Sequence, residues 1–301
     1  MVRRRVLCTL HQRSVSLGDR GPIVSFAFDD FPRTAYTTGG SILKSFGVRG
    51  TYYAAIGLMN TSNDLGEQFQ ADDLYSLVSN GHELAGHTFS HIRSSSIPLC
   101  AFQLDVKKGQ QAIRQITGIA PSGNFAYPYG DVTLAAKKAL GEEMTSCRGI
   151  FGGVNAPDLD LNLLRANSLY GDVDQLVHVE RLISENKAKK GWLIFYTHDV
   201  RDNPSRYGCT PALLVSALEA AMRSGSEIST VAGLVGELQA AAPPREITKA
   251  QQFGGFFYRK ITNRRATRLA SEAAPSHRSE DDSRGVALDS LGLGHRGYSG
   301  Q

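Results

Sequence analysis

The sequence predicts an α/β protein with a mostly parallel sheet. Short apolar runs alternate along the chain with segments whose apolar residues have helical spacing. Several of the apolar runs end in Asp, His or Tyr. The 301 residues, 41% of them hydrophobic, suffice for one large domain or two ordinary ones. Parallel strands require crossover connections, and the pattern alone is compatible with both an open sheet and a closed barrel.

The first half of the chain sets the alternation. "PIVSFAFDD" (22–30) is an apolar run that predicts a buried strand ending in two carboxylates. A helix over 37–48 and a strand over 49–57 follow. The segment 71–81 starts with acidic residues and ends at a glycine, as short helices do, and "HELAGH" (82–87) predicts the next strand.

The second half repeats the pattern, and two segments give the clearest signals. "WLIFYTHDV" (192–200) predicts a buried strand, and the helix expected over 173–191 has a basic last turn that suits the helix dipole. The other elements expected here are a strand over 123–131, helices over 100–118, 132–142 and 211–225, and the closing segment 226–241.

Charge and composition divide the chain into three parts. Residues 1–20 form an N-terminal extension, residues 21–242 the body and residues 243–301 a basic tail. The tail holds 10 Lys and Arg against 6 Asp and Glu, which leaves 23 of each in the rest of the chain. A neutral body argues against nucleic acid as a partner, because phosphate binding needs a basic face. The tail is expected to be disordered, with "FGGFFYRKI" as a segment that can dock on the body or on a membrane surface.

The start of the chain does not resemble a secretory signal, because polar residues soon interrupt its apolar run. No stretch approaches the roughly 20 apolar residues needed to span a bilayer. The four cysteines are scattered without a C-x-x-C pair, which favours reduced thiols. These observations predict a cytoplasmic protein without a transmembrane segment. They leave its oligomeric state open.

Residues able to do chemistry gather at the predicted strand ends. Asp29, Asp30, His87, Tyr129 and His198 each lie at or just past such an end. In parallel α/β folds the functional residues collect at the C-terminal ends of the strands. The sequence therefore predicts that these five residues share one site.

His87 and His91 in "GHTFSH" have the spacing of two ligands on one face of a helical turn. Considered alone, the pair is more often without metal than with it. Asp30 adds a carboxylate oxygen, and a site of two nitrogens and one oxygen keeps coordination positions open for water and substrate. Adjacent carboxylates on a strand face opposite ways, so Asp29 and Asp30 require a turn to reach one pocket.

Two further segments suit an acyl-transfer site. His198 follows an apolar run and can exchange a proton near neutral pH, although a structural histidine held by Asp199 explains the pattern equally well. In "FAYPYGD" (125–131), Pro128 fixes the chain direction and Gly130 permits a tight turn. A backbone N–H in such a turn can stabilise an oxyanion, and the alternative is an ordinary strand-to-helix turn.

"FAFDD", "HTFSH", "FAYPYGD" and "FYTHD" occur in the order and spacing typical of the polysaccharide deacetylase family, also called carbohydrate esterase family four, and the resemblance covers roughly residues 20–240. It implies a distorted, incomplete (β/α) barrel with a NodB-like domain and one divalent metal ion. The metal ligands implied by position are Asp30, His87 and His91. Asp29 resembles the catalytic base and His198 the catalytic acid. Zinc is the implied ion, with cobalt, nickel and manganese compatible with the same ligands.

The backbone N–H of Tyr129 matches the oxyanion donor, next to Pro128. Three features depart from the family pattern. Ala126 stands where many members carry an arginine that orients the catalytic Asp, and Arg165 is the candidate replacement. The Asp-x-x-x-Asp-Trp motif is not recognisable, although Asp158 and Asp160 lie in the expected region. Tyr196 stands two residues before the acid histidine, where a leucine commonly lines the acetyl pocket.

The resemblance implies a metal-dependent hydrolase that removes N-acetyl groups from amino sugars of an oligosaccharide or polysaccharide, such as a chitooligosaccharide or peptidoglycan. Two alternatives stay open. One is a glycan-binding member of the fold whose catalysis is weakened, and the other is a metal-dependent amidase or O-acetyl esterase that acts on a non-polymer substrate.

Overall fold

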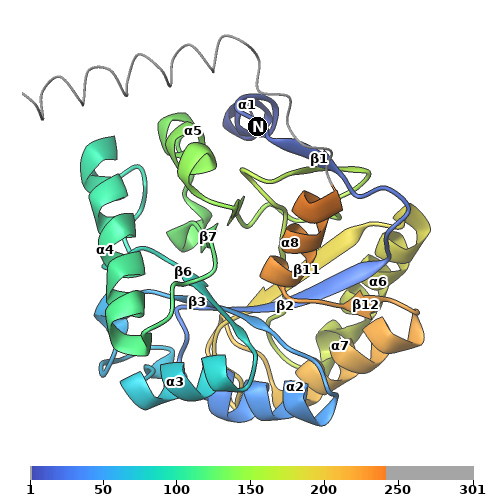
Figure 1. Ribbon diagram of the computed structural model, residues 1–301. Helices are drawn as coiled ribbons and strands as arrows, with labels where there is room; N and C mark the ends of the chain where they lie inside the picture. Colours follow the sequence, from blue (N-terminus) through green and yellow to red (C-terminus); the bar gives the residue numbers. More distant parts are fainter. Residues whose placement is uncertain (1, 242–301) are drawn as a thin grey trace, which may run out of the picture. The chain divides into compact units, whose positions relative to one another are not determined.

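The computed structural model describes residues 2–241, and the tail predicted for residues 243–301 lies outside them. Within the described range, eight strands form a curled sheet in the order β10-β11-β2-β3-β6-β7-β8, with β12 pairing to β2. All of these pairings are parallel. The edge strands β10 and β8 do not pair with each other, so the barrel is incomplete, and helices surround the sheet (Figure 1).

The strands of the curled sheet are β2 (Ile23–Asp29), β3 (Thr51–Ala54), β6 (Glu83–Gly86), β7 (Asn124–Ala126), β8 (Ser146–Arg148), β10 (Asn167–Ser168), β11 (Trp192–Thr197) and β12 (Glu227–Ile228). Two small antiparallel pairs lie outside it, β1 (Ser14–Ser16) with β9 (Asp158–Asp160) and β4 (Ser62–Asn63) with β5 (Gly66–Glu67).

The α-helices are α1 (Val2–Thr9), α2 (Ser41–Ser45), α3 (Ala71–Ser79), α4 (Leu99–Thr117), α5 (Leu134–Glu143), α6 (Leu176–Lys189), α7 (Pro211–Arg223) and α8 (Val231–Ala241). Short 3-10 turns lie at Ile56–Leu58, Pro128–Gly130 and Val173–Gln175. In the described part of the chain, none of the helices is both long and apolar enough to cross a bilayer.

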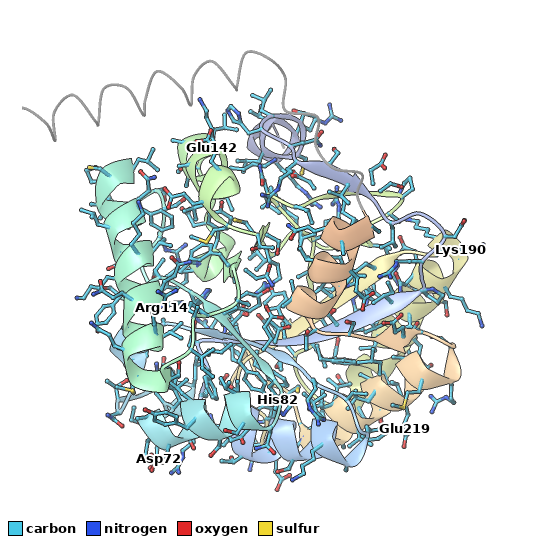
Figure 2. The ribbon with its side chains drawn as sticks, viewed as in Figure 1. Asp72, His82, Arg114, Glu142, Lys190 and Glu219 are labelled. Atoms are coloured by element: carbon cyan, nitrogen blue, oxygen red, sulfur yellow. The ribbon has the colours of Figure 1, made fainter. Side chains whose placement is uncertain are left out.

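Side chains alternate between the two sides of the sheet as the twofold strand period requires. On β2, Phe26 and Phe28 belong to the core between sheet and helices, whereas Ala27 faces the barrel interior. Tyr52 and Tyr53 divide in the same way on β3. Charged residues such as Asp72 on α3, Arg114 on α4 and Glu219 on α7 lie on the outer helix faces (Figure 2).

The helix predicted over 37–48 is instead a π-helical turn at Ala35–Gly40 followed by α2. Its glycines explain the difference. A Cβ on Gly39 would lie 3.0 Å from the Phe28 ring, so this turn packs closer to β2 than a regular helix with larger side chains could.

The N-terminal residues pack against the body through a buried cation. Lys137 on α5 is 0% exposed, and its Nζ donates hydrogen bonds to the carbonyl oxygens of Leu7 (2.6 Å) and Leu10 (2.8 Å). The same Nζ lies 2.6 Å from Oδ2 of Asp160. Since β1 also pairs with β9, the residues predicted as an extension contribute both backbone and side-chain contacts.

Candidate active site

A cavity of about 590 Å³ opens at the C-terminal ends of the parallel strands. It is lined by all five residues that were predicted to lie at strand ends and to share one site, namely Asp29, Asp30, His87, Tyr129 and His198. His91 lines it as well. The sheet therefore brings the predicted catalytic and metal-binding residues together.

Asp29 and Asp30 reach the same cavity because the chain turns sharply where β2 ends. Asp29 is the last strand residue and follows Ala27 on the inward side. Asp30 and Phe31 then adopt left-handed φ values of 59° and 63°. Left-handed φ values are uncommon for residues other than glycine. Here they turn the chain so that the carboxylates of Asp29 and Asp30, which would face opposite ways on a regular strand, both line the cavity.

His87 and His91 lie in the loop after β6, not on the helical turn expected from their spacing. Thr88 and His91 have left-handed φ values of 60° and 51°, and these turns bring the two imidazole rings to 5.1 Å between centroids. The convergence was predicted, but its backbone cause was not.

Asp105 on α4 fixes this loop. Its Oδ1 accepts hydrogen bonds from the backbone N–H groups of Phe89 and Ser90, each at 2.9 Å, and its Oδ2 accepts one from the Ser90 hydroxyl at 2.8 Å. A Cβ on Gly109 would lie 2.8 Å from the carbonyl oxygen of Thr88, so glycine there allows α4 to approach the loop.

The ligand atoms of Asp30, His87 and His91 all lie within 4.8 Å of one another. Nε2 of His87 is 3.1 Å from Oδ1 of Asp30, and Nε2 of His91 is 2.8 Å from the same oxygen. Burial by itself would raise the pKa of Asp30, but the hydrogen bonds and charges of the two histidines outweigh it and hold that pKa well below its usual range.

The hydrogen bonding of His87 tests whether this group fits a metal ion. Its Nδ1 lies 2.8 Å from the carbonyl oxygen of Ala126, which can only accept, so Nδ1 carries the hydrogen. A protonated ring donates from Nε2 to Oδ1 of Asp30, 3.1 Å away, whereas in the neutral ring Nε2 presents a lone pair toward this buried oxygen and gives it no donor. Converging lone pairs of one oxygen and two imidazoles suit a divalent cation, and a backbone carbonyl that accepts a hydrogen bond from Nδ1 is typical of metal-bound histidine.

His198 stands on the other side of Asp30. Its Nδ1 lies 3.1 Å from the backbone oxygen of Tyr207, and its Nε2 lies 3.9 Å from Oδ2 of Asp30. Asp199, the alternative partner considered from sequence, accepts hydrogen bonds from Ser205 and Arg201 instead. The carbonyl of Tyr207 thus holds the ring with Nε2 toward the cavity.

Tyrosines form much of the cavity wall. Tyr196 lines it as expected, together with Tyr129, Tyr170 and Tyr207. Tyr170 and Tyr196 meet edge to face with ring centroids 5.5 Å apart. Burial raises the pKa of both phenols, so both hydroxyls stay protonated and can donate hydrogen bonds.

Tyr129 has a left-handed φ of 58°, the residue is 51% exposed, and its ring packs against His91 with centroids 4.5 Å apart. Pro128 is buried at the start of the same turn and does not line the cavity. Arg165 does not line it either, because its guanidinium donates to the carbonyl of Gly152 at 3.3 Å. Asp158 and Asp160 belong to β9, away from the cavity lining.

Arg148 is the arginine that contacts Asp29, and sequence reasoning missed it. It is the last residue of β8, 1% exposed, and its Nη2 is ion-paired with Oδ1 of Asp29. Tyr170, Tyr207 and the Asn63–Leu65 part of the β4–β5 hairpin were also missed. The available signal for Arg148 was one arginine between Ser-Cys and Gly in a short stretch without strong periodicity.

The solved structure of a chitin deacetylase from the fungal pathogen Colletotrichum lindemuthianum has a similar fold. Its TM-score is 0.52 at 18% sequence identity, covering 77% of this chain and 92% of that one. A family 4 acetyl xylan esterase from Clostridium thermocellum gives a TM-score of 0.49 at 17% identity over 71% of this chain and 91% of that one. A mutant of a CE4 family pseudoenzyme gives 0.46 at 13% identity over 71% and 67%.

The search of curated proteins found no match. The family model described as polysaccharide deacetylase matches residues 18–144, which include the Asp29-Asp30 pair, His87, His91 and the third motif. This match shows that residues 18–144 resemble the polysaccharide deacetylase family, and the incomplete parallel barrel is the fold that the chain shares with the solved chitin deacetylase.

Proposed function

We propose that the protein is a metal-dependent N-deacetylase that acts on amino sugars of an oligosaccharide or polysaccharide. The observation that carries the proposal is the convergence of Asp30, His87 and His91, with Asp29 and His198 lining the same cavity. A divalent ion held by the three ligands would supply Lewis acidity toward water and the acyl carbonyl. Zinc suits the ligand set, as do cobalt, nickel and manganese.

The chain's own residues supply the proton transfers. Asp29 takes a proton from the attacking water, and the new C–O bond forms at the acetyl carbon. His198 Nε2, with its ring held by Tyr207 O, gives a proton to the departing nitrogen as the C–N bond breaks. Acetate and a free amine result. The backbone N–H of Tyr129 is the proposed donor to the oxyanion, an interaction typically worth on the order of 3 kcal/mol in the barrier.

The cavity wall supports a carbohydrate substrate. Tyr129 and Tyr207 expose 51% and 40% of their surfaces, and Tyr170 and Tyr196 carry protonated hydroxyls. Amphipathic tyrosine rings offer apolar faces and hydrogen-bonding tips, a combination that suits pyranose rings. The cytoplasmic location stays a prediction, and a protein located there would act on soluble oligosaccharides.

Acetate release from a substrate panel tests the proposal. Zinc-loaded protein is incubated with chitooligosaccharides, peptidoglycan fragments, O-acetylated xylooligosaccharides and a small acetamide, and the products are detected by mass. The proposal expects free amines from the N-acetylated sugars. Release from the O-acetylated sugars alone would make the protein an esterase, and binding without any release would make it a glycan-binding member of the family.

A further inference from the structure

The side chain of Arg148 runs through the barrel interior from an edge strand of the sheet to a strand near its middle. It comes from β8, an edge strand, and its guanidinium reaches Asp29 at the end of the central strand β2. On the way it lies over the rings of Tyr53 (4.7 Å from Cζ to the centroid) and Tyr196 (5.1 Å). Its Nη1 donates to the carbonyl oxygen of Gly149 at 3.1 Å.

The neighbouring strand leaves room for this path. Ala126 on β7 is the register partner of Arg148 on β8, so the two residues stand side by side across the sheet. Ala126 faces the barrel interior, as do Ala27 and Ala85 on strands nearer the centre. Small side chains at these positions leave the interior open to a long side chain that enters from the edge.

Arg148 and Asp29 form a buried ion pair, and each charge compensates the burial of the other. Asp29 is 5% exposed, and a buried carboxylate needs a partner. Burial alone would lower the pKa of Arg148, but the charge of Asp29 outweighs it and the guanidinium stays protonated. The guanidinium holds one carboxylate oxygen of Asp29 in place, and this restrains the orientation of a carboxylate that lines the cavity.

We propose that Arg148 is the positioning residue for Asp29, and that it reaches from β8 the place that an arginine at position 126 on β7 would otherwise occupy. The inference rests on the proposed function for the role of Asp29 in turnover, but the Arg148–Asp29 geometry can be tested separately. Positions 126 and 148 are register partners on adjacent strands. An arginine at either position can therefore reach Asp29, and the residue at the other position must be small.

Three variants test the proposal. Arg148→Ala removes the guanidinium, Arg148→Lys keeps a charge without the planar fork, and Ala126→Arg combined with Arg148→Ala moves the guanidinium to the register partner. Arg223→Met on the exposed face of α7 is the matched control. Metal content and kcat and KM for acetate release are measured for each, with and without added guanidinium.

Arg148→Ala is expected to keep its metal and lose about 100-fold in kcat with little change in KM, because misplacing a reacting group costs on that order. Added guanidinium and the relocated arginine should each recover about tenfold or more of that loss. Arg148→Lys should remain well below wild type. A kcat of Arg148→Ala within threefold of wild type would overturn the proposal, as would a loss that neither guanidinium nor the relocated arginine reverses.

Crystal structures separate this inference from the proposed function. In Arg148→Ala, or in Arg148→Lys if the alanine variant does not fold, the Asp29 carboxylate is expected to rotate from its wild-type orientation. In the double variant it is expected to return. An unchanged Asp29 in the single variant overturns the positioning role even where turnover falls. A wild-type protein that is inactive on every substrate refutes the deacetylase function, and the crystal structures then still decide the role of Arg148.

Discussion

Nδ1 of His198 lies 3.1 Å from the backbone oxygen of Tyr207, and this contact turns Nε2 toward Asp30. A backbone carbonyl thus orients the histidine. The resemblance implies that an Asp-x-x-x-Asp-Trp motif tunes this histidine, and that motif is not recognisable in this sequence. A carbonyl fixes the ring and places the hydrogen on Nδ1 without adding a charge. Nε2 is therefore the ring nitrogen of His198 that faces Asp30.

Replacing His198 with alanine is expected to separate substrates by their leaving group. An amine departs only with a proton, so deacetylation of chitooligosaccharides should fall by about 100-fold or more. Hydrolysis of 4-nitrophenyl acetate, whose leaving group needs no proton, should fall by less than about tenfold. Steady-state kinetics on both substrates measure the difference. Equal losses on the two substrates would show that His198 is not the acid.

Asp29→Asn is expected to keep the metal ion and abolish turnover. The amide has nearly the same shape as the carboxylate but cannot accept a proton from water, so both substrates should lose about 100-fold or more. Metal analysis of the purified variant, beside its kinetics, checks the result. Loss of the metal together with activity would show that Asp29 rather than Asp30 is the metal ligand.

His82 is expected to make the protein less stable in acid. Burial, followed by the positive charge of Arg49, lowers the pKa of His82 to about 4 from its ordinary 6.5. Its neutral Nδ1 also accepts a hydrogen bond from the N–H of Gly50 at 3.1 Å. The unfolded chain takes up the proton near pH 6.5 and the folded one only near pH 4, so stability present above pH 6.5 is lost as the pH falls between these values.

From pH 7 to pH 5 this linkage amounts to roughly 2 kcal/mol of unfolding free energy. Urea unfolding at the two pH values should show a wild-type loss that exceeds the loss in His82→Asn by about that amount. His178→Asn, at an exposed histidine on α6, serves as the control and should behave as wild type. The same acid sensitivity in His82→Asn and wild type would rule out this origin.

Deleting residues 1–12 is expected to destabilise the body through Lys137. The deletion removes the carbonyls of Leu7 and Leu10, so that of these three partners the Lys137 ammonium keeps only Asp160. Breaking a buried charge network of this kind costs about 3 kcal/mol or more. Urea unfolding of the deletion variant measures the loss.

Lys137→Met provides the matched test of this cause. In the deletion variant it should recover about 1 kcal/mol or more, because methionine at position 137 does not need the two lost carbonyls, whereas Lys138→Met on the exposed face of α5 should recover nothing. If the deletion costs less than about 0.5 kcal/mol, the N-terminal residues are an independent extension.

Sequence reasoning predicted residues that line one cavity because strand ends are strong signals. The runs ending at Asp29 and His198 fold as β2 and β11, and the parallel arrangement brings their ends to one edge. The local backbone of the His87–His91 loop was wrongly expected to be helical, since the left-handed φ values at Thr88 and His91 depend on contacts with α4. Those contacts are 15 or more residues away in the chain and have no local signature.

The contact between Arg148 and Asp29 could not be predicted from local sequence either. Arg148 lies 119 residues from Asp29 in sequence, on a strand of three residues, and only the curl of the sheet brings the pair together. Arg165, the candidate chosen from sequence, is on the same part of the chain but hydrogen-bonds to Gly152 instead. Short edge strands and contacts across a barrel interior are set by the whole fold.

Titration of the metal-free protein with zinc tests the central claim most directly. Calorimetry should give one site per chain in the wild type, as expected of a catalytic centre with three protein ligands. His87→Ala and His91→Ala should each weaken that binding by about 100-fold or more, while His178→Ala should bind as wild type does. Unchanged zinc affinity in both variants, or acetate release at the full rate from metal-free protein, would contradict a metal centre at Asp30, His87 and His91.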